Sequence, residues 1–432
     1  MTILNTSDWW LSHTAGAPDA DWLAHVRAML GVDGDGSLSP RYTTMPAAGE
    51  QPWLYSTMPA PIASPLPSPI SNANPPPTSP SETPPPIDGV YFDDQWHFDF
   101  LGDIETIWEE YSGAGVHVGI YDDGLQYTHP DLDGTYDSSR QVTVGGEVLD
   151  PDFYATVYLF PHGTSVAGLI GAEKNDFGTT GVAWGSSLTG VPIFYGPANI
   201  NADYDAFIEA VDQSENFDVI NHSWGKSPFF WQHPIPIEQD AKLIAEWMEA
   251  LENGRDGLGT IQVKAAGNDN RNANGDGATT SRATIVVGAY DDDGDASYYS
   301  NFGSNLLVSA PSSGTPANRG VVTTDVLGLD GGYNVLDENG QYTDEADYTN
   351  QFGGTSAATP IVTGVIALML QANPELGWRD VQNILAYSAR EVGSGVGGER
   401  AADENDDWRY NGADKLERRR SPLFGRLRLR LG

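Results

Sequence analysis

The sequence predicts an α/β fold with a mainly parallel central sheet flanked by helices. Strand-like runs near residues 116, 218, 260 and 284 alternate with helix-like runs near 162, 240, 356 and 378. This alternation is typical of parallel sheets whose strands are joined by crossover helices. A chain of 432 residues, 39% of them hydrophobic, can bury one large core and still carry flanking segments. One sizeable α/β domain is therefore expected.

Composition divides the chain into four segments. Residues 1–58 hold one short amphipathic patch, too small for a core, and could be a propeptide, an export element or a disordered arm. Residues 59–87 contain 12 of the 29 prolines and predict an extended linker. The main domain is expected over residues 88–413. Residues 414–432 form a basic tail, with seven of the 22 Lys and Arg residues in its last 18 positions.

Three short glycine-flanked motifs carry candidate catalytic side chains. The alternating run 116–121 predicts a strand that delivers Asp122 to its carboxyl edge, where ligand sites of open α/β sheets lie. His162 opens a small, apolar run that predicts a buried helix. Ser356 opens a second such run, in which Pro360 comes early enough for a helix to tolerate its missing N–H.

An acid, an imidazole and a hydroxyl in this order indicate a serine hydrolase. The hydroxyl needs a base to become nucleophilic, and the base needs a carboxylate to fix its tautomer. Each residue alone has an ordinary alternative: Asp122 as a turn cap, His162 as a helix-start histidine, Ser356 as an N-cap. Their joint occurrence favours catalysis. Asn268, at the end of a strand-like run, offers an amide donor for an oxyanion beside the start of the Ser356 helix.

Over about residues 88–413 the chain resembles the subtilisin-like serine protease superfamily, and within it the kexin and furin-like branch. The resemblance rests on Tyr121-Asp-Asp-Gly-Leu-Gln-Tyr-Thr-His-Pro-Asp-Leu132, His162-Gly-Thr-Ser-Val-Ala-Gly168, Asn221-His-Ser-Trp-Gly225, Ala266-Gly-Asn268 and Gly353-Gly-Thr-Ser-Ala-Ala-Thr-Pro360. It implies a three-layer subtilisin-like fold. It also implies that Asp122 orients His162, that His162 is the general base and acid, that Ser356 is the nucleophile and that Asn268 is the oxyanion donor.

The polar, glycine-containing loop 173–183 is either an ordinary exposed loop or a calcium site. The resemblance favours a structural Ca²⁺. The ligands it implies are the side chains of Asn175 and Asp131 and the main-chain oxygens of Glu173, Phe177 and Thr179, with Asp88 as a further carboxylate.

The resemblance also implies a substrate preference. Asp123 matches an acid that holds a basic residue two positions before the cut, and Asp276 matches the acid at the floor of the primary pocket, which Ser223, Trp224 and Gly225 border. Both indicate cleavage after Lys or Arg, with paired basic residues as one form of the site. The sequence departs from the family where Lys226-Ser-Pro-Phe229 and Asn301 replace the usual acids. A second calcium site is therefore left open.

The charge of the chain limits its partners. Sixty acidic residues against 22 basic ones give a net charge of −38, which repels nucleic acid and anionic membranes and favours basic protein or peptide substrates. Adaptation to a saline environment would give the same surface. With no cysteine, disulfides cannot contribute. No apolar run reaches the roughly 20 residues of a transmembrane helix, and we expect a monomer.

Location and activity leave alternatives. The first ten residues lack the basic start and apolar stretch of a secretory signal. Family members usually act outside the cytosol, so export by another route is preferred over a cytosolic role. The tail departs from the family pattern and is interpreted as truncated or out of frame, or as a genuine basic anchor. Together with the change at 226–229, it keeps open an inactive, calcium-binding relative that only binds peptides.

Overall fold

In the computed structural model of the chain, the described residues are 91–158, 160–226, 238–314, 319–328, 332–333 and 347–391, with the pairs 409–410, 416–417 and 425–426. The predictions for residues 1–58 and 59–87, and those for nearly all of 414–432, lie outside these residues. The candidate ligand Asp88 lies outside them too.

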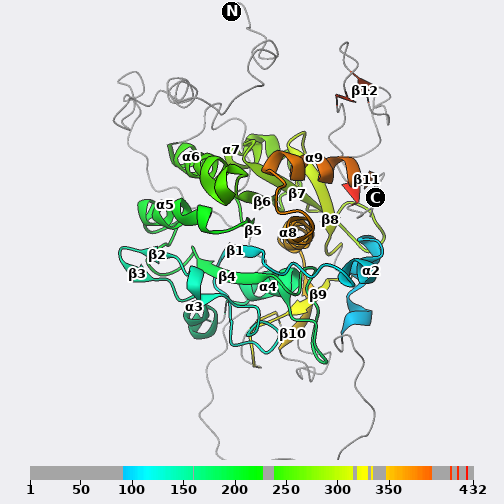
Figure 1. Ribbon diagram of the computed structural model, residues 1–432, viewed down its shortest axis with the longest axis horizontal. Coiled ribbons are helices and arrows are strands. Elements are labelled where there is room, and N and C mark those ends of the chain that lie inside the picture. The colour runs from blue at the N-terminus through cyan, green and yellow to red at the C-terminus, as the bar shows by residue number, and fades with distance from the viewer. Residues whose placement is uncertain are drawn as a thin grey trace, which may run out of the picture.

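Six parallel strands form the body of the central sheet (Figure 1). In spatial order they are β4 (Ser187–Pro192), β1 (His117–Asp122), β5 (Val219–His222), β6 (Ile261–Ala265), β7 (Thr284–Tyr290) and β8 (Leu306–Pro311). Every neighbouring pair among them is parallel. Two-residue strands β14 (Gly425–Arg426) and β11 (Arg390–Glu391) extend the sheet beyond β8.

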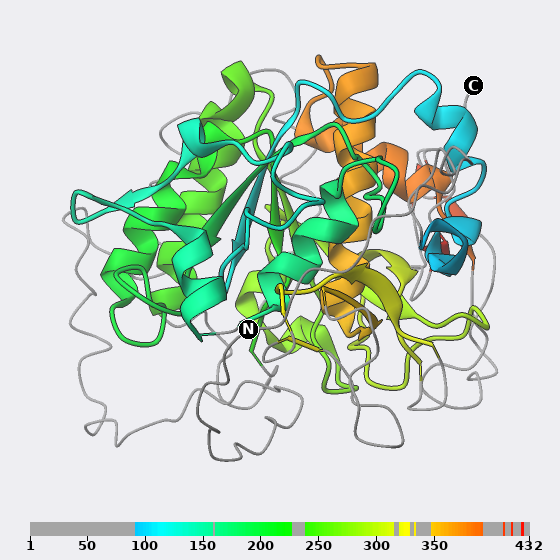
Figure 2. The ribbon, with the colours of Figure 1, turned by 90° about the horizontal axis from the view of Figure 1, so that it is seen from below.

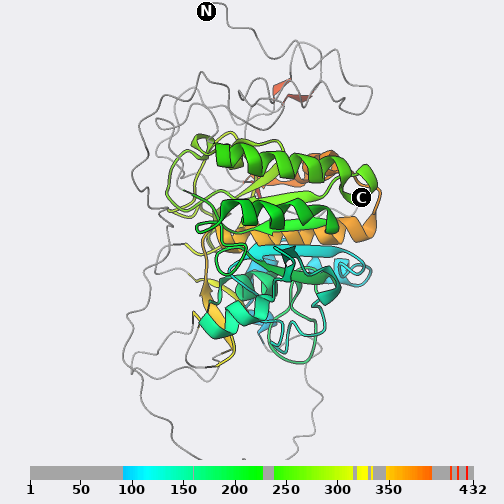
Figure 3. The same cartoon turned by 90° about the vertical axis from the view of Figure 1, so that its left-hand side faces the viewer.

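Helices cover both faces of this sheet. They are α2 (Ile104–Trp108), α3 (Pro151–Tyr158), α4 (His162–Gly171), α5 (Tyr204–Asp212), α6 (Glu238–Asn253), α7 (Gly277–Thr280), α8 (Thr355–Ala372) and α9 (Trp378–Ser388). Helices α4 and α8 pack on one face, and α5 and α6 lie together on the other (Figures 2 and 3). Smaller two-stranded sheets pair β2 (Thr143–Val144) with β3 (Glu147–Val148), β9 (Val321–Thr324) with β10 (Tyr348–Phe352), and β12 (Arg409–Tyr410) with β13 (Leu416–Glu417).

Successive side chains of a strand point to opposite faces of the sheet, and each face packs against helices to form a hydrophobic core. In β1, Val118 and Ile120 pack into the core formed with α4 and α8, whereas Tyr121 packs into the core formed with α5 and α6. In β6, Ile261 and Val263 point to the α8 side. Because side chains of a strand alternate between faces, Lys264 lies on the opposite side of the sheet. The predicted three-layer α/β architecture is confirmed.

Helix α8 runs through the centre of the molecule. Its 18 residues are apolar enough to cross a membrane by length and composition, but 83% of that stretch is buried inside the protein. It packs against the sheet and against α4. A core helix of an α/β domain accounts for its composition.

Candidate active site

The candidate residues gather at the carboxyl edge of the sheet. Asp122 is the last residue of β1, Ser223 follows β5, and Asn268 follows β6. These three strands are neighbours and parallel, so their carboxyl ends meet at one edge. Helices α4 and α8, which carry His162 and Ser356 in their first turns, begin beside this edge.

Asp122 and His162 form a direct side-chain pair. Oδ1 of Asp122 lies 2.7 Å from Nδ1 of His162, and the carboxylate is almost fully buried. This contact requires α4 to start very close to the end of β1. A Cβ on Gly163 would lie 1.9 Å from the Gly124 carbonyl oxygen, so only glycine permits this approach.

The charges around His162 favour its protonated form. Burial alone lowers the pKa of His162, but the charge and hydrogen bond of Asp122, with the charge of Asp123, outweigh burial and raise the pKa to about 9. Asp123 accepts hydrogen bonds from the Gly163 N–H at 2.7 Å and the His162 N–H at 3.3 Å. Its carboxylate therefore caps α4. Burial and the neighbouring Asp122 charge raise the pKa of Asp123 to about 7.

Ser356 is held against the segment after β5. Its hydroxyl donates to the Ser223 carbonyl at 3.0 Å, and the Ser223 hydroxyl donates to the Ser356 carbonyl at 2.9 Å. Within the described residues, Ser356 and His162 make no hydrogen bond to each other. The His162 ring instead lies edge-on to Phe352, four residues before Ser356, at 5.4 Å between centroids. Catalytic hydrogen bonds are often long without substrate, so this arrangement is compatible with a serine nucleophile.

Asn268 lies against the two residues that precede Ser356. Its Oδ1 accepts from the Thr355 N–H at 2.8 Å and from the Thr355 hydroxyl at 2.9 Å. With the oxygen fixed in this way, Nδ2 is the group left to donate. Gly354, with φ of 74°, passes so close that its Cβ would lie 3.0 Å from Nδ2.

The loop that carries Asn268 is fixed by Asn301. Asn301 Oδ1 accepts from the N–H groups of Asp269 and Arg271 at 3.0 and 2.9 Å, and its Nδ2 donates to the Ala266 carbonyl at 2.9 Å. Asn301 thus has a structural use where the resemblance implies an acid.

A carboxylate–imidazole pair, a serine at a helix start and a side-chain amide, all at one edge of a doubly covered parallel sheet, are typical of an α/β serine hydrolase. The chain belongs to the subtilase family, whose model matches residues 113–415.

Three relatives illustrate this membership. Proprotein convertase subtilisin/kexin type 5 of Branchiostoma californiense is 33% identical over 66% of this chain and 16% of its own length. A calcium-dependent protease of Trichormus variabilis is 31% identical over 70% of this chain and 47% of its own length. The crystal structure of a serine protease of Aeromonas sobria matches with a TM-score of 0.61 and 29% identity, covering 73% of this chain and 60% of that one. The chain thus spans less than half the length of these two sequence relatives.

The candidate calcium loop closes around Asp131. Asp131 Oδ2 accepts from the Thr179 N–H at 2.8 Å, and Oδ1 accepts from Asn175 Nδ2 at 3.1 Å. Tyr348, which sequence reasoning missed, adds a hydroxyl from β10. These partners are all uncharged. A Cβ on Gly178 would lie 2.1 Å from Asp131 Oδ2, so the loop wraps closely around this carboxylate.

The remaining predicted ligands lie in the same loop. The Phe177 N–H donates to Asn175 Oδ1 at 3.0 Å, and the Glu173 N–H donates to the Asp131 carbonyl at 2.8 Å. The Glu173 side chain accepts from the Gly134 N–H at 2.7 Å. The buried carboxylate of Asp131, with its uncharged partners, and the amide oxygen of Asn175 are oxygen ligands of the kind that Ca²⁺ prefers.

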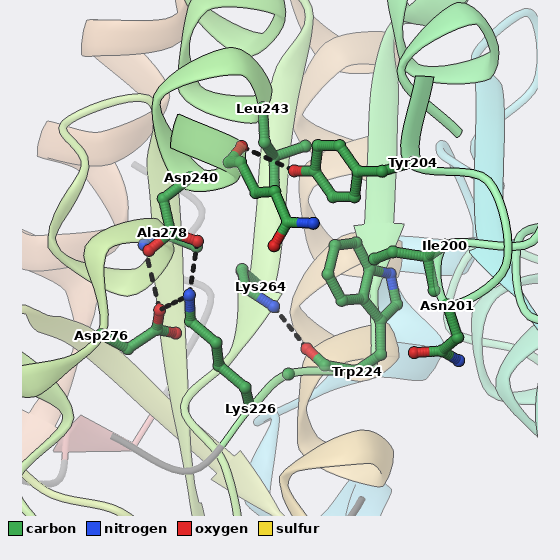
Figure 4. Close-up of a pocket in the computed structure, with 12 residues that line it drawn as sticks. Ile200, Asn201, Tyr204, Trp224, Lys226, Asp240, Leu243, Lys264, Asp276 and Ala278 are labelled. Atoms are coloured by element: carbon green, nitrogen blue, oxygen red, sulfur yellow. Dashed lines mark hydrogen bonds and ion pairs between the residues drawn. The ribbon is translucent and has the colours of Figure 1, made fainter. Parts of the chain in front are cut away.

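Trp224, Gly225 and Asp276 line a pocket of about 80 Å³ beside Ser223 (Figure 4). Asp276 is buried and also caps the short helix α7, since its Oδ1 accepts from the Ala278 N–H at 3.2 Å. Asp123 is not among the lining residues. Among the charged residues that line the pocket, sequence reasoning missed two, Asp240 and Lys264. The sequence offered a clue to Lys264, because a charged residue within the largely apolar β6 segment indicates a polar site on one face of the sheet.

Proposed function

We propose that the chain is a serine endopeptidase with a peptidase domain over about residues 88–413. Asp122, His162 and Ser356 are its catalytic residues, and Asn268 is the oxyanion donor. The observation that carries this proposal is the 2.7 Å contact between Asp122 and His162 Nδ1. In the neutral imidazole, Nδ1–H donates to this carboxylate, so Nε2 is the acceptor that a general base needs.

The proposed reaction has two halves. Nε2 of His162 takes the hydroxyl proton of Ser356 as its Oγ attacks the peptide carbonyl carbon, and Asn268 Nδ2 stabilises the negative oxygen of the tetrahedral intermediate. His162 then gives this proton to the leaving amine, and an acyl-enzyme remains. Water, deprotonated by His162, then attacks the acyl carbon, and His162 returns the proton to Ser356 Oγ as the bond to the acyl carbon breaks and the acid is released.

Peptide hydrolysis and labelling by a fluorophosphonate together test this proposal. We expect the purified chain to cleave an unstructured protein and to react with one equivalent of probe. A folded sample that neither hydrolyses nor reacts would contradict the proposal. It would favour the alternative, a catalytically impaired protein that binds calcium and peptides.

The proposed substrate has a basic residue before the scissile bond. Support comes from the buried carboxylates of Asp276 and Asp240 in the pocket next to Ser223. The role of Asp123 toward the preceding substrate residue is also proposed. Its carboxylate caps α4 and keeps lone pairs for a further donor.

The rate should depend on pH through His162. Below its pKa of about 9 the imidazole is protonated and cannot accept the Ser356 proton, so kcat/KM should rise from pH 7 to about pH 9. The variant Asp123→Asn removes a charge that raises this pKa and keeps an oxygen for the Gly163 N–H. In this variant we expect the rise of kcat/KM with pH to occur at a lower pH, by on the order of one pH unit. A rise at the same pH in both proteins would contradict this role of Asp123.

We further propose that Asp131, Asn175 and the main-chain oxygens of Glu173, Phe177 and Thr179 hold a structural Ca²⁺, with Asp88 as a further ligand. The close wrapping of the 173–179 loop around Asp131 supports this site. The similar protease of Trichormus variabilis is named calcium-dependent. Structural calcium sites of moderate affinity suit the millimolar calcium outside cells, so we also propose that the chain acts there.

Chelation should lower the thermal stability of the protein. A ligand present at 100 times its Kd stabilises the native state by about 2.7 kcal/mol, so we expect EGTA to lower Tm by roughly 5 °C or more. The variant Asp131→Asn should start with the lower Tm and respond little to chelator. The exposed-site variant Glu215→Gln is the matched control and should respond like the wild type. Equal melting of the wild type in calcium and in EGTA would contradict the site.

A further inference from the structure

The pocket beside Ser223 already holds a cation of the chain itself. It lies between the segment after β5, the N-terminal end of α6 and the segment that leads into α7 (Figure 4). Apolar side chains, including Trp224 and Leu243, form much of its wall. Its charged groups are Lys226, Asp240, Lys264 and Asp276.

The ammonium of Lys226 lies between the two carboxylates. Nζ donates to Asp240 Oδ1 and lies 3.8 Å from Asp276 Oδ1. Both acids are buried, whereas 31% of the Lys226 side chain is exposed. The side chain of Lys226 thus places its ammonium group between the two buried acids, as Figure 4 shows.

Lys264 brings a second positive charge from the sheet. Its Nζ donates to the Trp224 carbonyl and lies 4.1 Å from the centre of the Trp224 ring. The side chain is fully buried, and burial, together with the charge of Lys226, lowers the pKa of Lys264 to about 8, against the opposing effect of Asp276 and Asp240. Two ammonium groups thus balance two carboxylates.

We propose that Lys226 is a tethered occupant of the substrate pocket, bound between Asp240 and Asp276 where the basic side chain of a substrate would bind, and that it must leave before such a side chain can enter. This inference rests on the proposed function and makes Lys226 a specificity-determining residue. Lys226 lies three residues after Ser223, whose carbonyl accepts the hydrogen bond of the Ser356 hydroxyl, so one short segment connects the pocket to the bond that is cut.

The consequence concerns the preference of the enzyme. A substrate Lys or Arg exchanges one cation for another, so it gains little electrostatic free energy from a pocket that is already balanced. Without Lys226, the two carboxylates would face only the positive charge of Lys264, and an entering cation would make the pocket electrically neutral again. Lys226 therefore weakens the selection of basic over neutral side chains.

The variants Lys226→Ala and Lys226→Met test this inference. Methionine keeps much of the side-chain length and removes the charge, so together the variants separate charge from bulk. Lys242→Ala is the control, since Lys242 lies on the same helix as Asp240 but pairs with the exposed Asp205 at 2.7 Å. We expect kcat/KM for peptides with Lys or Arg before the cut to rise by about tenfold or more in both Lys226 variants. This rise should exceed the change for a matched leucine peptide by about tenfold, and the control Lys242→Ala should keep the wild-type preference within about twofold.

A binding measurement separates this inference from catalysis. In a Ser356→Ala background, p-aminobenzamidine provides an amidinium whose affinity needs no hydrolysis. We expect Lys226→Ala to tighten its Kd by about tenfold or more, and this result would support the inference even if the chain proved inactive. An unchanged Kd, in a Lys226→Ala protein that melts like its parent, would overturn the inference. Lys226 would then be a structural ion pair only.

Discussion

Substitution of Ser356 by alanine should abolish peptide hydrolysis. We expect kcat to fall by roughly 10⁶-fold, which is the loss that removal of the nucleophilic serine causes in a subtilisin. The physical reason is that the proposal has a single nucleophile, the Ser356 hydroxyl at the start of α8, whose proton His162 accepts. Hydrolysis of a fluorogenic peptide measures this loss.

The control for this variant is Ser304→Ala, which removes an exposed hydroxyl bonded to Asn274 at 3.2 Å. It should keep full activity. The fold of Ser356→Ala should survive, because the Ser223 hydroxyl can still donate to the carbonyl of residue 356. Substantial hydrolysis by a folded Ser356→Ala protein would mean that another residue is the nucleophile.

The variant Asp122→Asn should lower kcat by roughly 10⁴-fold while leaving the fold intact. A neutral amide at this position no longer stabilises the imidazolium, and its NH₂ group favours the tautomer in which Nδ1 accepts and Nε2 carries the proton. His162 could then no longer take the proton of Ser356. Steady-state kinetics and the rate of fluorophosphonate reaction should decline together, because both depend on this base.

A second acid–histidine pair in the chain provides the control. Asp137 Oδ2 lies 3.4 Å from His117 Nδ1, at a site remote from the sheet edge that carries Ser223 and Asn268. Asp137→Asn should therefore leave kcat within about twofold. Equal losses in both variants would indicate a general effect of removing charge from this acidic protein rather than a catalytic role of Asp122.

The sequence was sufficient to predict the parts of the fold that have strong local patterns. Strands β1, β5, β6 and β7 and helices α4, α6, α8 and α9 lie where their runs of residues indicate. Strands β4 and β8 were missed. The β4 segment, Ser187–Pro192, contains Gly190 and small polar residues, and it pairs with β1 because tertiary contacts outweigh its weak propensity.

The site was predictable as a set of residues but not as a set of contacts. The order of Asp122, His162 and Ser356 indicated a triad, and the structure pairs the first two. The sequence could not indicate that the Ser356 hydroxyl would donate to the Ser223 carbonyl, because that hydrogen bond joins residues 133 positions apart. The ion pair of Lys226 with Asp240 was hidden for a different reason. Asp240 lies only 14 positions further along, in the first turn of the next helix, but it is the fold that brings the two side chains together.

A crystal structure of the chain after reaction with a fluorophosphonate tests the central claim most directly. The account predicts a single phosphonyl group on Ser356 Oγ, with one of its oxygens within hydrogen-bonding distance of Asn268 Nδ2 and His162 Nε2 turned toward the adduct. An adduct on any other residue, or one on Ser356 that leaves His162 and Asn268 uninvolved, would contradict it.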